Sequence, residues 1–255
     1  MITIDQYAYI NKWKAIHPIE KFCLAIFTLM ISLLNTSWLL HAIVITFMSF
    51  LIVFKARIPA KTYAGFMMLP MLFLIMGVAG IAIDITKDAN LLMIGFPIGE
   101  WMVGISKQGF KEAAVVFTRA YAAVTCLYLL ALTTPMVDII SLLKRLKIPG
   151  ILIELMILIY RFIFVLMETG AMIYVSQDCR LGYSSYYKSY HSLGQLISNL
   201  FIKAFHRSNE LYLALSARGY TGELKVLEED FAISKTNIGF ILFWLFFLLI
   251  LTYML

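Results

Sequence analysis

The stretch FCLAIFTLMISLLNTSWLLHAIVITFMSFLIVF, residues 22–54, consists of two long apolar runs separated only by the polar triplet 35–37. Pro18 and Glu20 precede it and suit a helix start, because proline is tolerated in the first turn and an acid favours the positive end of the helix dipole. Counted from Pro18, each run has about 17 residues, the short end of the range that crosses a bilayer. The stretch therefore predicts a hairpin of two membrane-spanning helices.

Three further apolar segments of similar length follow, at residues 63–83, 113–133 and 237–255. Hydrophobic residues make up 62% of the 255 residues and charged residues only 14%, against roughly 45–50% and 25% in soluble domains. This composition excludes an ordinary soluble enzyme and a disordered chain. We therefore predict an all-α integral membrane protein with about five transmembrane helices. For the apolar stretch 91–96, inside the loop 84–112, we predict a re-entrant piece or a hairpin.

Basic residues flank the predicted helices unevenly, and the net charge is +6. Six of them lie around the open end of the first hairpin, whereas its tip carries no charge and the loop 84–112 carries three lysines and four acids. Because Lys and Arg accumulate on the cytoplasmic side of membrane proteins, we predict a multi-pass protein of the cell membrane that does not bind nucleic acid. Its N-terminus is expected inside and its C-terminus outside. The six residues are Lys12, Lys14, Lys21, Lys55, Arg57 and Lys61.

The chain divides into three predicted regions. Residues 1–133 hold four transmembrane helices, residues 134–236 form a cytoplasmic helical region, and residues 237–255 form the last transmembrane helix. The middle region is expected to be cytoplasmic because it carries the polar and charged stretches that cannot all lie in lipid.

Within the middle region we predict a short amphipathic helix at 136–147 and a long helix at 151–181, which only Gly170 interrupts. Residues 182–194 are rich in Ser and Tyr and are predicted to form a polar break. Small and apolar residues then recur at helical spacing, which predicts a second long amphipathic helix that ends at a glycine. The recurring residues are Leu196, Leu200, Ala204, Leu211 and Leu215.

Four charged residues lie inside apolar helices. Arg119 lies about one and a half turns into the span that starts at 113, and Glu154, Arg161 and Glu168 are spaced by seven along the long helix. Seven residues span about 10 Å, so these three share one stripe but cannot pair with one another. Charges within a membrane helix are by default candidates for function. We expect structural roles for both arginines: snorkelling, or pairing with acids such as Asp138.

The two long helices of the middle region have similar ends. The first ends in Cys179-Arg180-Leu181 and the second in Ala217-Arg218-Gly219. A cation at a helix C-terminus stabilises the helix by about 0.3–1 kcal/mol, and this alone explains a single arginine. The repetition favours a second explanation, since arginine offers a rigid fork to an acidic partner and a small neighbour permits close approach.

These ends resemble the transmembrane T component of energy-coupling factor (ECF) transporters, a class of ABC importers. In that family two coupling helices each end in a small-Arg-small motif that docks on an ATPase subunit. Ala217-Arg218-Gly219 matches this motif closely, whereas Cys179-Arg180-Leu181 departs from it at Leu181, which is not small. The resemblance implies that residues 134–236 are the coupling-helix region.

Other segments resemble the cobalt and nickel type of this family, CbiQ, in the same order along the chain. This similarity implies uptake of cobalt or nickel ions, while a T component of a vitamin transporter stays the alternative. The matching segments are Asp5–Tyr9, Pro18–Lys21, Arg119–Ala120, Thr133–Pro135, Ile148–Pro149 and Tyr160–Phe162.

The resemblance also implies partners. They are two ATP-binding subunits, which would bind ATP and Mg, and a membrane-embedded S component that binds the substrate. The motion of the ATPases would pass through the coupling helices and tip the S component. No catalytic residue and no cofactor are expected in this chain, which lacks the phosphate-binding motif G-x-x-x-x-G-K-[ST].

Two other classes of function remain as remote alternatives. A membrane-embedded enzyme would have to use His191, His206 and the acids of the middle region, but no pair shows catalytic or metal-ligand spacing. A self-contained permease would be expected to carry several charges in its spans, and only Arg119 does so in the first four. We expect no metal site, because the histidines are scattered and none of the three cysteines forms a CxxC pair.

Overall fold

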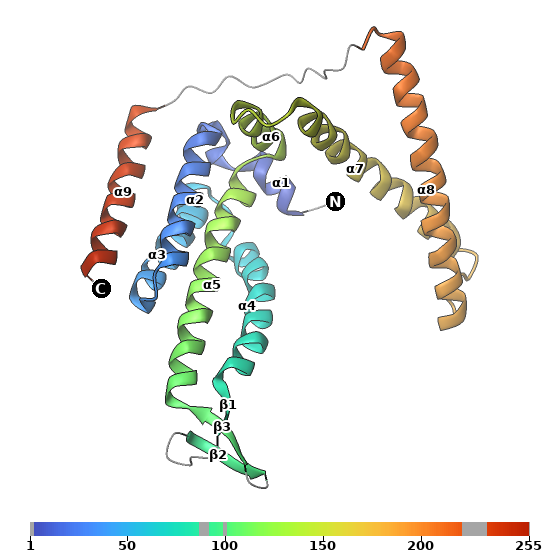
Figure 1. Cartoon of the computed structure of the whole chain (residues 1–255). Coiled ribbons are helices and arrows are strands. Elements are labelled where there is room, and N and C mark those ends of the chain that lie inside the picture. The colour runs from blue at the N-terminus through green and yellow to red at the C-terminus, as the bar shows by residue number, and fades with distance from the viewer. Residues whose placement is uncertain (1–2, 87–91, 99–100, 221–233, 255) are drawn as a thin grey trace. The chain divides into compact units, whose positions relative to one another are not determined.

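The structure, a computed structural model, describes residues 3–86, 92–98, 101–220 and 234–254 (Figure 1). The chain divides into two compact units. The larger unit consists of residues 2–135 together with 230–255, and the smaller unit consists of residues 136–229. The larger unit contains the predicted hairpin, and the smaller one contains the two long helices whose ends resemble each other.

The larger unit is built around one helix, α5. α1, α2, α3 and α4 all contact α5, and its residues Cys126, Leu129 and Leu132 are buried in one apolar core with Leu40 and Val44 of α3 (Figure 1). The helical elements are α1 (Thr3–Ile10), η1 (a 3₁₀ turn, Lys12–Ala15), α2 (Pro18–Leu34), α3 (Trp38–Phe50), η2 (a π-helical turn, Leu51–Lys55), α4 (Ala60–Ala82), α5 (Lys107–Thr133) and α9 (Lys235–Met254).

The predicted hairpin is confirmed as α2 and α3. Pro18 occupies the first position of α2, and the ring Nδ1 of His17 accepts a hydrogen bond from the backbone N–H of Ile19 at 3.1 Å. The polar triplet ends the helix because the side chain of Asn35 accepts a hydrogen bond from the N–H of Ser37 at 2.7 Å. A local turn therefore replaces the helical hydrogen bonds at the tip.

The last helix, α9, is held against the hairpin by Trp244. Its ring stacks on Phe47 of α3 with centroids 3.5 Å apart, and its indole N–H donates to the hydroxyl of Thr28 on α2 at 3.3 Å. A buried indole N–H needs such an acceptor, so the polar Thr28 inside an apolar run has a packing role.

A small antiparallel sheet connects α4 to α5. Its strands are β1 (Ile83–Thr86), β2 (Leu92–Ile98) and β3 (Trp101–Ser106), in the order β1-β3-β2. The pairing of β2 with β3 confirms the hairpin predicted around residues 91–96, but β1 was not predicted. The helix after the sheet begins at Lys107, six residues before the predicted start, because the Ser106 hydroxyl caps it by accepting from the N–H of Gly109 at 2.9 Å.

The smaller unit contains α6 (Met136–Arg145), α7 (Gly150–Asp178) and α8 (Tyr186–Ala217). The short helix and the first long helix agree with the prediction. The predicted polar break at 182–194 was wrong for most of its length, since α8 already begins at Tyr186. Polarity and two glycines indicated a loop, but Ser185 caps the helix and Ser192 is buried, so the serines serve the helix.

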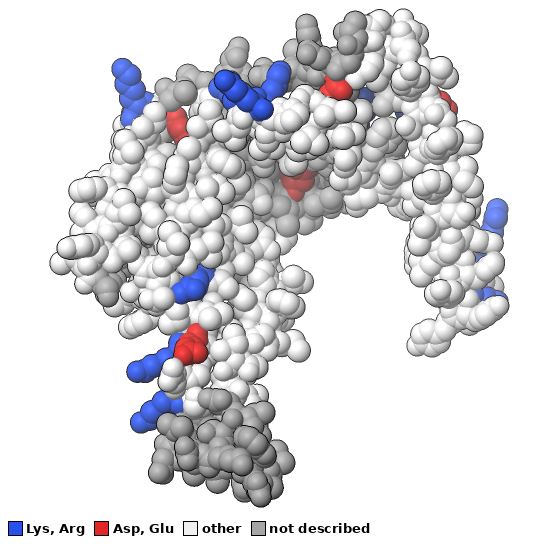
Figure 2. All heavy atoms as spheres, viewed as in Figure 1, with Lys and Arg blue, Asp and Glu red and all other residues white. Residues whose placement is uncertain are grey.

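Among the described residues, five helical segments are long and apolar enough to cross a membrane: Trp38–Lys55, Ala60–Ala82, Lys107–Thr133, Gly150–Asp178 and Lys235–Met254. The number agrees with the prediction, but the membership differs. α2 has 17 residues and is not among them, whereas α7 has a mean hydropathy of 2.3, the highest of the five. Figure 2 shows that most of the visible helical surface carries no charged side chain. α7 is thus as apolar as a membrane-spanning helix.

Candidate functional site

The end of α7 forms a compact hydrogen-bonded turn. The N–H of Gly182 donates to the carbonyl of Gln177 at 2.9 Å, and the N–H of Leu181 donates to the carbonyl of Asp178 at 2.9 Å. Leu181 has a positive φ of 58°. Two such bonds around a left-handed residue define the Schellman motif, which satisfies the last carbonyls of a helix. Arg180 is the residue just before the left-handed one.

The end of α8 forms the same turn. The N–H of Tyr220 donates to the carbonyl of Leu215 at 3.0 Å, and the N–H of Gly219 donates to the carbonyl of Ser216 at 3.1 Å. Gly219 is the left-handed residue, with φ of 75°. Arg218 therefore occupies the position that Arg180 occupies on α7, so the similarity of the two sequences is also a similarity of backbone geometry.

The six predicted docking residues fall into two equivalent and exposed triplets. Cys179 directly follows the last residue of α7, and Ala217 is the last residue of α8. An arginine comes next in each triplet, and Leu181 and Gly219 complete the turns; all six residues are exposed. Within the described residues, neither arginine makes a side-chain hydrogen bond or an ion pair. Both guanidinium groups are therefore available to an acidic group on another molecule.

A cluster of polar contacts fixes the end of α7 to the start of α8. The side-chain amide of Gln177 donates to the carbonyl of Ser192 at 3.1 Å and accepts from the Tyr183 hydroxyl at 2.8 Å. The Ser192 hydroxyl donates to the carbonyl of Gly182 at 2.9 Å. A β-carbon on Gly182 would lie 2.8 Å from both the Gln177 carbonyl and the Ser192 hydroxyl, so glycine is required there. This cluster was not predicted from the sequence, where Gly182 is its only visible sign.

A second contact fixes the other end of α8 to the start of α7. The hydroxyl of Tyr220 donates to the Glu154 carboxylate at 2.8 Å. This hydrogen bond, with the negative charge of Glu154, raises the pKa of Tyr220. Glu154 thus has a partner outside its own helix, which is consistent with the expectation that the three charges of its stripe do not pair with one another. Tyr220 directly follows the left-handed glycine, a position whose side chain often packs back on its helix, and this was the available signal.

Between these ends the two helices pack in antiparallel fashion along their length. Leu200 of α8 lies against Gly170 of α7, where an added β-carbon would be 3.2 Å from its Cδ1. The five residues predicted to form the inner face of α8 are all less exposed than their neighbours, which confirms that face. Phe162 and Val165 of α7 and Leu211 of α8 line a groove of about 230 Å³ between the helices.

Arg161 lies at this groove together with Arg207 and Glu210 of α8. Arg207 pairs with Glu210 at 3.0 Å, and both are largely exposed. Pairing with an acid was one of the structural roles considered for Arg161, and among the described residues Arg161 forms no ion pair. Its guanidinium is exposed, as is Glu168, so water satisfies both charges in the isolated chain.

Arg119 lies deeper in its helix than predicted. Because α5 begins at Lys107, Arg119 is twelve residues into a helix of 27. It is partly buried, and its Nε is a buried atom without a hydrogen-bond partner in the part of the chain that the structure describes. In the described residues Arg119 forms no ion pair with an acid, the second of the two roles considered for it. A titratable neighbour of Arg119 is His41, whose ring is buried between the Ser32 carbonyl and the Thr118 hydroxyl.

No group of three His, Cys, Asp or Glu side chains that could hold a metal ion occurs in the described residues. The arrangement that remains is two exposed arginines on equivalent helix ends, joined by a helix pair that is tied at both ends. Exposed guanidinium groups without an internal partner are chemically suited to acidic groups on another molecule.

Comparison with known proteins decides the family. A family profile described as CbiQ, cobalt transport protein, matches residues 11–228, which include both arginine turns. The chain belongs to the CbiQ family. CbiQ proteins are T components of energy-coupling factor transporters, so the resemblance drawn from the sequence is confirmed.

Three relatives are similar to this chain over almost their whole length. An uncharacterised protein of Methanocaldococcus jannaschii is 33% identical, covering 98% of this chain and 92% of that protein. The cobalt transport protein CbiQ of Rhodobacter capsulatus is 32% identical, covering 94% and 93%. The energy-coupling factor transporter transmembrane protein EcfT of Listeria innocua is 25% identical, covering 96% and 98%.

Proposed function

We propose that this chain is the membrane scaffold that passes the movement of two ATPase subunits to a substrate-binding S component. The observation that carries the proposal is the identical Schellman turn with an exposed arginine at the ends of both α7 and α8. Helix capping alone would explain one arginine at a helix end, but it does not require the same turn and arginine on both helices. Two equal docking points suit two related ATPase subunits, which would supply the bound ATP and Mg.

Each arginine would enter an acidic or carbonyl-lined groove of one ATPase. The left-handed residue turns the chain sharply away after the arginine, so the side chain stands at the very end of the helix. Cys179 and Ala217 are short enough to let a partner backbone approach. The contacts at Gln177 and Tyr220 then carry force from one helix to the other, because the two helices are held at both ends.

The S component would cover the apolar surface that the helix pair leaves exposed. Monomeric proteins rarely expose continuous apolar stripes unless a partner or lipid covers them. Here a stripe of α8 at four-residue spacing lies beside the face that contacts α7. It consists of Leu193, Ile197, Phe201 and Phe205, which are exposed by 46%, 66%, 72% and 60%.

We propose that the N-terminus and this helix pair are cytoplasmic and that the C-terminus lies outside.

We propose cobalt or nickel ions as the substrate of the complete transporter. Two relatives that the chain matches over most of its length are named cobalt transport protein, which favours this assignment. The vitamin alternative rests on relatives named EcfT, which are also similar. The chain itself would not select the ion, because selection belongs to the S component.

The docking assignment is tested by charge reversal. In the double variant Arg180→Glu and Arg218→Glu, the co-expressed ATPases should no longer co-purify with the chain, because each docking point becomes repulsive. Lys203→Glu is the matched control, since Lys203 is an exposed cation on α8 away from both turns. Retention of the ATPases by the double variant, with normal membrane insertion, would refute the assignment.

A further inference from the structure

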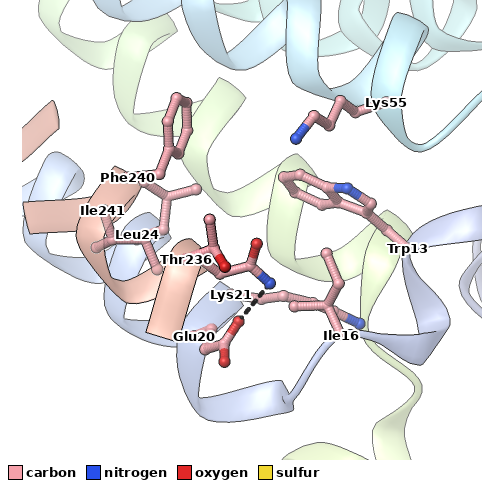
Figure 3. A pocket seen from close by; sticks show the side chains of 10 residues that line it. Trp13, Ile16, Glu20, Lys21, Leu24, Lys55, Thr236, Phe240 and Ile241 are labelled. Carbon is pink, nitrogen blue, oxygen red and sulfur yellow. Dashed lines mark hydrogen bonds between the residues drawn. The ribbon is translucent and has the colours of Figure 1, made fainter. Parts of the chain in front are cut away.

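A hollow of about 210 Å³ opens in the larger unit where η2 ends and α2 and α9 begin (Figure 3). Its walls are mainly apolar and aromatic. Trp13 of η1, Leu24 of α2, and Phe240 and Ile241 of α9 line it. Neither the arginine turns nor the helix pair of the smaller unit takes part, so the proposed function does not account for this hollow.

Lys55 brings a positive charge to the hollow. Its side chain is exposed, and its Nζ lies 5.7 Å from the centroid of the Phe240 ring. In Figure 3 the ammonium points into the space between Phe240 and Trp13. As far as the chain is described, this Nζ has no hydrogen bond and no ion pair. An ammonium that lies near an aromatic ring and forms no ion pair is suited to bind an anion.

The acid that lines the hollow is already engaged. Glu20 is 5% exposed; one carboxylate oxygen accepts from the backbone N–H of Ser234 at 2.9 Å and the other from the side-chain amide of Asn237 at 2.9 Å (Figure 3). The second lysine of the lining, Lys21, is 2% exposed and donates to the carbonyl of Thr133 at 2.9 Å. Both residues serve contacts between helices, and Lys55 is the cation that faces the open space.

An apolar groove of about 290 Å³ runs along the neighbouring face of α2 and α9 and shares Glu20 and Ile241 with the hollow. Its lining passes from Ile19 to Phe27 on α2 and from Ile238 to Leu245 on α9, about two turns along each helix. It leads away from the helix ends into the apolar part of the bundle. A cation at one end and an apolar groove beyond it match an amphiphile whose head is anionic.

We propose that this hollow binds the phosphate headgroup of an anionic phospholipid. Lys55 contacts the phosphate, the rings of Trp13 and Phe240 flank the glycerol, and an acyl chain follows the groove between α2 and α9. Three more exposed cations at the same end of the unit attract anionic lipids over neutral ones. They are Lys12, Arg57 and Lys61. A free phosphate fits less well, because the apolar walls would strip its hydration without replacing it.

The proposal is tested by lipid binding to the purified full-length chain in detergent, followed by native mass spectrometry. Phosphatidylglycerol, phosphatidylcholine and inorganic phosphate are the three probes. Phosphatidylglycerol should bind best, and Lys55→Gln should weaken its binding about tenfold, the loss expected for one charge-assisted contact. Lys55→Arg should retain binding, because it keeps the charge.

Lys61→Gln is the matched control: it removes another exposed cation that does not line the hollow. It should leave the binding of phosphatidylglycerol nearly unchanged. Three results would each overturn the proposal: equal binding of the two lipids, equal loss in Lys55→Gln and Lys61→Gln, or displacement of the lipid by millimolar inorganic phosphate. The last would mark a site for free anions.

Discussion

Leu181 and Gly219 hold the same left-handed backbone, although only glycine does so without cost. A left-handed conformation costs an L-residue about 1–2 kcal/mol, so Leu181 must be held by its turn and by the Gln177–Ser192 contact beside it. By side-chain size, the third residue of the small-Arg-small motif differs between the two ends. The structure shows that Leu181 and Gly219 share a positive φ angle, so the two helix ends are more alike than their residue types indicate.

Replacing Gly219 by alanine should destabilise the end of α8 by about 1 kcal/mol, because alanine pays for the positive φ. Gly194→Ala provides the control. Gly194 lies inside α8 with open space around it, so alanine there should stabilise the helix by about 0.5–1 kcal/mol. Hydrogen exchange of the last-turn amides should speed up only in Gly219→Ala. Equal exchange in both variants would contradict the assigned backbone role of Gly219.

At the scale of elements, the helix pair α7–α8 is tied where its two ends meet. The sequence predicted the inner face of α8 from its spacing, because periodicity reflects packing. It could not predict the ties at Gln177 and Tyr220, since each joins residues 15 or more positions apart. It also placed the start of α8 too late, because capping by Ser185 outweighs the polar composition that follows.

Removing one hydroxyl tests the tie at the end of α8. Tyr220→Phe keeps the ring but loses the hydrogen bond to Glu154. With one spin label at the end of α8 and one at the start of α7, the distribution of distances between the labels should therefore become broader. Glu154→Gln is the informative control, because its amide oxygen still accepts from the phenol and should preserve a narrow distribution. If Tyr220→Phe stays as narrow as the parent chain, the tie does not hold the helices.

The same tie has a defined pH dependence. Glu154 raises the pKa of Tyr220 above the ordinary value of about 10. A raised folded-state pKa contributes stability that is fully present below that ordinary value and is lost as pH rises through the raised pKa. The spin-label distances should therefore be constant through neutral pH and broaden only in strong alkali. Broadening near neutrality would point to another group.

At the scale of the whole molecule, hydropathy predicted the class of protein and the number of long apolar helices. It could not distinguish a helix that crosses lipid from one that a partner covers, since both are apolar. α7 shows this: it is as apolar as the spans, yet only Ile153 of its residues is buried within the chain. The small sheet before α5 was missed in part, because β1 follows directly from the apolar α4.

Transport by the assembled complex tests the central claim most directly. The chain, two ATPase subunits and an S component would be reconstituted in vesicles, and ATP-driven uptake of radioactive cobalt would be measured. We predict uptake by the parent complex and by the Lys203→Glu control, and loss of uptake in Arg180→Glu with Arg218→Glu. Uptake by the double variant at the parental rate would contradict the claim that these two helix ends couple the ATPases to transport.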